Sequence, residues 1–126
     1  MDEQVMNYLL ADAISRYSAI SGSPAVKLTA KKLKMQSASK RIQISGNDTF
    51  SKVRDAVNEC GKIMLEDENR NLVEALVKSG SSGMNPAVVV AEIDGETMDI
   101  CAYAKEGLIN QHTAEKAIEK VMSKLE

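Results

Sequence analysis

The sequence predicts an α+β fold with a single antiparallel sheet of about four to five strands and helices packed mainly on one face. Apolar residues recur at helical spacing near both ends of the chain and in its middle. An alternating pattern surrounds Asp94–Gly95, as in a β-hairpin. The 126 residues are 44% hydrophobic and 27% charged, which suits one globular domain. We therefore expect a single domain over 1–126 with the order α-β-β-α-β-β-β-α.

The first element is a helix over about 3–19. The chain "SGSP" at 21–24 ends it, because Gly and Pro do not continue a helix. One apolar stripe marks the helix, formed by Val5, Met6, Leu9, Leu10, Ala13, Ile14 and Tyr17.

Residues 25–45 are predicted to form a strand hairpin. The alternation of apolar residues changes parity at Lys31–Lys32, which a β-bulge would explain. A short helix from Thr29 to about Ser39 is the alternative for the first half. "KRIQIS" at 40–45 alternates more clearly and is interpreted as a strand.

A second helix is predicted over "GNDTFSKVRDAVNECGKIMLED", residues 46–67, with Asp48 or Thr49 as its cap. Gly61 weakens this helix, and close packing on a neighbour would be a reason for a glycine there. "EDENR" at 66–70 is interpreted as a solvated helix end. The apolar stripe that indicates the helix consists of Phe50, Val53, Val57, Cys60 and Met64.

The rest of the chain predicts strands and a final helix. "NLVEALVKSG" at 71–80 suits either a helix or a strand, and we favour the strand. A type I′ turn at Asp94–Gly95 would pair Val89 with Ile100 and Ala91 with Met98. The last helix follows His112 or Thr113. One face of the hairpin is almost wholly apolar and is expected to meet helices, namely Ala87, Val89, Ala91, Ile93, Met98, Ile100 and Ala102.

This order is similar in general kind to that of the roadblock and profilin-like folds. The likeness concerns the fold alone, because no motif in the sequence extends it to a function.

Charge is unevenly distributed, although the net charge is only −2. Residues 13–47 contain bases and no acid, so they could present a basic face to an anionic partner or to an acidic part of a second copy. A lysine-rich strand edge that resists aggregation is the simpler interpretation. The candidate anion-binding residues are Lys27, Lys31, Lys32, Lys34, Lys40 and Arg41.

The segment "KSGSSGMNP" at 78–86 is the second candidate. Its Gly80-x-x-Gly83 spacing matches that of a nucleic-acid-binding KH loop, but a strand rather than a helix is predicted to follow. A phosphate loop would also need a Lys and a helix after the glycines. We interpret the segment as a connecting loop, with a binding loop or subunit contact as the alternative. Its candidate binding residues are Ser79, Gly80, Ser81, Ser82, Gly83 and Asn85.

No catalytic constellation is found. Cys101 and His112 could form a nucleophile pair, but a packing thiol and a helix-start residue explain them more simply. Two cysteines and one histidine do not suffice for a zinc site, and we expect no metal and no cofactor. Isolated cysteines and an acidic N-terminus favour a cytoplasmic location without a membrane segment.

These observations favour a small, non-enzymatic interaction or regulatory module that self-associates, for example as a homodimer, or binds a protein partner. An anion-binding module for nucleic acid or a phosphorylated ligand is the alternative, and it would use the basic residues between 26 and 41. A small enzyme acting through Cys101 or His112 is the third hypothesis.

Overall fold

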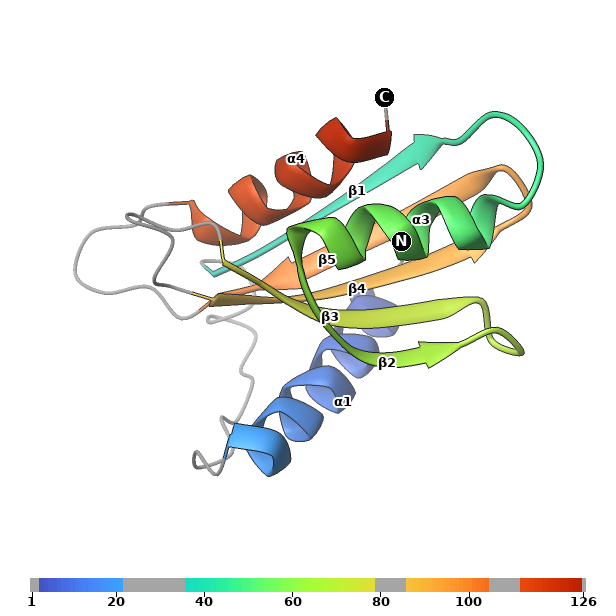
Figure 1. Cartoon of the computed structure of the whole chain (residues 1–126). Helices are drawn as coiled ribbons and strands as arrows, with labels where there is room; N and C mark the ends of the chain where they lie inside the picture. Colours follow the sequence, from blue (N-terminus) through green and yellow to red (C-terminus); the bar gives the residue numbers. More distant parts are fainter. Residues whose placement is uncertain (1–2, 22–35, 79–85, 105–111, 126) are drawn as a thin grey trace.

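Helices cover both faces of one five-stranded antiparallel sheet in the computed structural model (Figure 1). The structure describes residues 3–21, 36–78, 86–104 and 112–125. The predicted fold class, an α+β chain with a single antiparallel sheet, is confirmed. The described elements, in chain order, are α1 (Glu3–Ser21), β1 (Ser37–Gln43), α3 (Thr49–Cys60), β2 (Gly61–Asp67), β3 (Leu72–Lys78), β4 (Pro86–Asp94), β5 (Thr97–Tyr103) and α4 (Thr113–Leu125).

The strands lie in the order β1-β5-β4-β3-β2. Strands β2 to β5 form a meander in which each strand pairs antiparallel with the next. β1 joins from a distant part of the chain and pairs with β5, so that Lys40 lies opposite Ile100. β1 and β2 are therefore the two edge strands of the described sheet.

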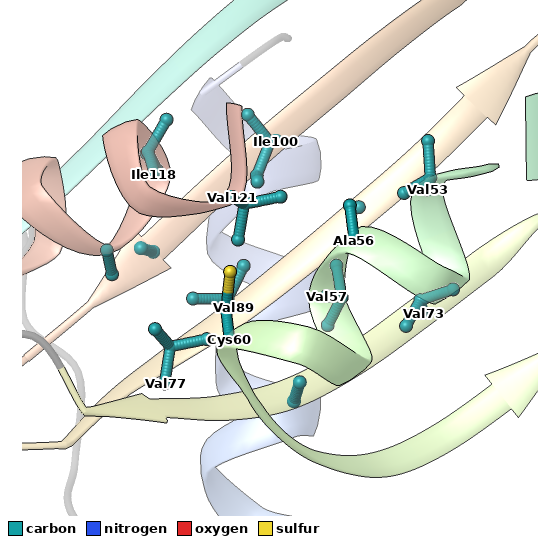
Figure 2. Packing of buried hydrophobic residues seen from close by; sticks show 14 of the residues in the cluster. Val53, Ala56, Val57, Cys60, Val73, Val77, Val89, Ile100, Ile118 and Val121 are labelled. Atoms are coloured by element: carbon teal, nitrogen blue, oxygen red, sulfur yellow. The ribbon is translucent and has the colours of Figure 1, made fainter. Parts of the chain in front are cut away.

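Two helices, α3 and α4, pack on one face of the sheet, which we call the α3/α4 face. Figure 2 shows α3 residues such as Val57 and α4 residues such as Val121 in one cluster with the strand residues Val89 and Ile100. All seven apolar hairpin residues predicted to meet helices lie in this core, which confirms the predicted face. Burying branched side chains of this size contributes about 1.5–3 kcal/mol each to folding.

The third described helix, α1, covers the opposite face, called the α1 face, and packs on β4 and β5 (Figure 1). Leu10 and Ala13 are fully buried there, which confirms the predicted stripe of the first helix except at Val5, whose side chain is 43% exposed. The strand residues beneath α1 include Leu72, Val90 and Cys101. The sheet thus has a hydrophobic core on each face.

The predicted helix over 46–67 is wrong beyond Cys60. α3 ends at Cys60, and Gly61–Asp67 form β2, with Met64 on a strand. Gly61 permits the abrupt change, because a Cβ at this position would collide with the backbone oxygen of Leu76 on β3. "EDENR" accordingly spans the end of β2 and the turn into β3 instead of a helix end.

The predicted turn at Asp94–Gly95 is displaced by one residue. Asp94 pairs with Thr97, so Gly95 and Glu96 are the two turn residues, and Val89 pairs with Ala102. Gly95 has a positive φ of 59°, whereas Glu96 does not belong to the described residues with positive φ. A positive φ at the first turn residue alone is the pattern of a type II′ turn. Each β4 residue therefore pairs with a β5 residue two positions further along than predicted. Because two is an even number, every side chain keeps its predicted face.

The other predictions divide between confirmed elements and residues outside the described ranges. The strands predicted at 40–45 and 71–80 are present as β1 and β3, and the last helix begins at Thr113. Asp48 occupies the N-cap of α3, but its side chain makes no capping hydrogen bond. The first half of the predicted 25–45 hairpin, up to residue 35, lies outside the described residues.

Within the described ranges, no helix combines the length and hydropathy that a bilayer-spanning segment requires.

Candidate partner-binding site

Two of the twelve candidate binding residues, Lys40 and Arg41, lie in the described part of the chain, and both belong to β1. The others lie outside the described residues, so the structure does not place them. They are Lys27, Lys31, Lys32, Lys34, Ser79, Gly80, Ser81, Ser82, Gly83 and Asn85.

Lys40 and Arg41 lie on opposite faces of the sheet, because successive residues of a strand alternate. Lys40 is opposite Ile100 on the α3/α4 face, whereas Arg41 is opposite Asp99 on the α1 face. Arg41 donates to both carboxylate oxygens of Asp99, over 2.8 and 3.1 Å. This pair lowers the pKa of Asp99 and raises that of Arg41. The charge of Arg41 is therefore already matched within the fold.

The hydrogen-bond pattern of β1 shows which backbone groups face outward. The Ile44 amide donates to the Glu96 carbonyl over 2.6 Å, and the Ala104 amide donates to the Gln36 carbonyl over 3.1 Å. In an antiparallel pair, bonded and non-bonded residues alternate, so the even-numbered residues bond to β5. The odd-numbered residues Ser39, Arg41 and Gln43 direct their N–H and C=O groups away from β5. No strand of the described ranges lies on that side of β1.

A hollow of about 340 Å³ adjoins the end of β1 on the α3/α4 face. The apolar part of its lining comes from the sheet and from the last turn of α4, and Lys52 of α3 is the only cation among the described residues that line it. The Lys52 ammonium donates to the Ser45 carbonyl over 2.7 Å. The lining residues are Ile42, Gln43, Ile44, Ser45, Lys52, Met122 and Leu125.

The outward-facing backbone of Ser39, Arg41 and Gln43 and this hollow together form a surface that we call the β1 site. An exposed strand edge offers donors and acceptors for another strand, and an adjacent, partly apolar hollow offers a place for one of its side chains. The sequence indicated Lys40 and Arg41 but not the hollow, whose walls are about 80 residues apart in the chain.

A buried acid, Glu74, is the polar feature that sequence reasoning missed. Glu74 is on β3 beneath α1 and is 0% exposed. One carboxylate oxygen accepts a hydrogen bond from Arg16 Nε over 2.9 Å, and Arg16 also contacts Asp12 over 3.3 Å. Burial raises the pKa of Glu74, and Arg16 opposes that rise. Alternation in "LVEAL" was the available signal, since Glu74 shares a face with Leu72 and Leu76.

The two cysteines are buried thiols. Burial raises the pKa of Cys101 to about 12, whereas a nucleophilic cysteine needs a lowered pKa. His112 is at the start of α4, where its Nδ1 lies 2.9 Å from Glu115. These placements agree with a packing thiol and a helix-start residue.

Among the residues that the structure describes, no three His, Cys, Asp or Glu side chains gather in a way that could hold a metal ion. Comparison of the sequence with protein-family models and with curated proteins finds no match in either.

Proposed function

We propose that the protein is a small, non-enzymatic, cytoplasmic interaction module that binds an extended segment of a protein partner at the β1 site. The observation that supports this function most directly is the outward-facing backbone of Ser39, Arg41 and Gln43 next to a partly apolar hollow. Main-chain hydrogen bonds would supply affinity, and the hollow would supply selectivity for one side chain.

A second copy of the chain fits the edge less well than a different protein. β1 spans Ser37–Gln43, so its centre is Lys40. A two-fold antiparallel pair centred there would place Lys40 opposite Lys40 of the other copy, and directly opposed like charges are destabilising. Self-association through β1 is therefore an outcome that the experiment below must distinguish.

An anion-binding surface gains no support from the described bases. Lys40 and Arg41 point to different faces, and Arg41 is paired with Asp99. Phosphate groups attract clustered cations with available charge.

Site-specific photo-cross-linking tests the proposed function. A photoreactive residue at Gln43 should give a discrete protein adduct in cells, whereas one at exposed Glu59 of α3 should not. Mass spectrometry of the adduct identifies the partner or a second copy. Ser39→Pro should abolish the adduct, because proline removes an outward-facing amide without breaking a bond to β5. Ser39→Ala keeps that amide and should preserve the adduct.

Circular dichroism checks that both Ser39 variants retain the fold. If Ser39→Pro unfolds, Gln43→Pro takes its place, and the photoreactive residue is then moved to position 39. Adducts that are equally abundant from positions 43 and 59, or that persist with proline in β1, would rule out binding at this edge.

A further inference from the structure

Resting on the proposed function, we infer that the segment bound at the β1 site is acidic and carries a large apolar residue and a carboxylate two positions apart. The apolar residue enters the hollow, and the carboxylate pairs with Lys40. This partner chemistry follows from three features of the site: strand periodicity, the lining of the hollow, and the distribution of charge over the two faces.

Strand periodicity fixes the spacing. Lys40 and Ile42 are opposite Ile100 and Met98, which both belong to the α3/α4 core, so the two β1 side chains lie on the same face. A strand added to β1 has the same two-residue period. Its residue opposite Ile42 and its residue opposite Lys40 are therefore two positions apart and also point to the α3/α4 face.

The hollow selects the apolar residue. Ile42, Ile44, Met122 and Leu125 provide the apolar part of its walls, and Gln43, Ser45 and Lys52 complete the lining. Its volume of about 340 Å³ is at the lower end of the range for small-molecule sites, which suits one large side chain. Met122 can adjust to the shape of that side chain, because an unbranched thioether packs adaptably.

The charges select the carboxylate. Lys40 is exposed and has no ion-pair partner among the described residues. An acidic residue directly across the strands would match it. The opposite face needs no charge from the partner, since the Arg41–Asp99 pair is neutral as a unit and Ser39 and Gln43 are uncharged. Within β1 itself, the requirement for an acid is thus confined to the position facing Lys40.

Selection from a displayed library of random ten-residue peptides on the intact, immobilised chain tests this inference. Enriched peptides should combine a large apolar residue with Asp or Glu two positions away. Their affinity for Lys40→Glu should fall about tenfold, the expected effect of replacing an attractive cross-strand pair by a repulsive one. Lys62→Glu, the same change on the other edge strand, should leave it unchanged. Selection on Lys40→Glu should enrich Lys or Arg at that position instead.

The Ser39 variants separate the two ways in which the result could fail. Peptides that lose binding with Ser39→Pro and keep it with Ser39→Ala, but lack the acid or ignore Lys40→Glu, overturn the inferred chemistry alone. The absence of any enriched peptide, or enriched peptides that bind Ser39→Pro as well as the original chain, overturns the proposed function too.

Discussion

At the scale of single residues, the contact between Glu74 and Arg16 joins a fully buried acid to a partly exposed base. A carboxylate with 0% exposure is costly to bury and requires a counter-charge. The counter-charge comes from Arg16, 58 residues earlier in the chain. The pair therefore connects α1 to β3, the strand next to the edge strand β2.

Removing the arginine should cost more than removing the acid. Arg16→Met leaves the Glu74 carboxylate buried without its partner and should lower the free energy of unfolding by about 2–3 kcal/mol, slightly below the range for fully buried pairs. The Arg16 side chain is 35% exposed, so in Glu74→Met it still contacts water and Asp12. The loss of unfolding free energy should therefore be smaller in this variant. Urea unfolding at pH 7 of both variants and of the double variant measures this. A larger loss in Glu74→Met would contradict it.

Glu74 should also make the stability depend on pH. Burial raises its pKa above the ordinary value of 4.5, so the folded state holds the proton more tightly than the unfolded state. The contribution of Glu74 to stability is then greatest below about pH 4.5 and is lost as the pH rises through the folded-state pKa. Glu74→Gln lacks this titration. Its difference in unfolding free energy from the original chain, measured at a series of pH values, should change in that window; a flat difference would refute the expectation.

At the scale of elements, the junction of α3 and β2 is defined by one glycine. Residues on the predicted helical stripe continue past Gly61 to Met64, so spacing alone extends the helix. The strand signal in "GKIMLED" is short and is interrupted by the irregularity between Ile63 and Leu65. The helix propensity of glycine and its close approach to β3 together explain why the helix stops at Cys60.

Gly61→Ala should therefore destabilise the protein even though alanine favours helices. The added Cβ would overlap the Leu76 carbonyl, and backbone shifts of this kind cost about 1–3 kcal/mol. A thermal melt should show a decrease in Tm of roughly 4–12 °C. Asn58→Ala, on the exposed side of α3, is the matched control and should change Tm little. Equal melting of the two variants would show that β2 can move away from β3.

The elements that the sequence predicted well are those in which the apolar residues follow a single periodicity, either that of a helix or that of a strand. The β4–β5 hairpin kept its faces despite the displaced turn, because a shift by an even number preserves alternation. Glu74 was missed for the opposite reason, since "NLVEALV" fits both periods and its partner Arg16 belongs to a distant helix. Sequence periodicity describes faces within an element and not which elements meet.

At the scale of the whole molecule, the candidate site illustrates the same limit. The basic character of Lys40 and Arg41 was evident from the sequence, and their separation onto two faces follows from the strand that was predicted at 40–45. The hollow depends on α4 ending over β1, a tertiary arrangement that no local pattern encodes. The two proposals therefore rest on the position of β1 at the sheet edge.

The strand order also has a consequence for how the protein is made. β2 to β5 pair with sequence neighbours, whereas Lys40 of β1 must meet Ile100, 60 residues later. Closing a loop of that length costs roughly 2 kcal/mol more chain entropy than closing a short turn. On the ribosome, at roughly 5–20 residues per second, β1 is complete about 3–12 s before its β5 neighbour is synthesised. During that interval β1 lacks its β5 partner, so the nascent chain presents to its surroundings the edge of β1 that β5 covers in the folded protein.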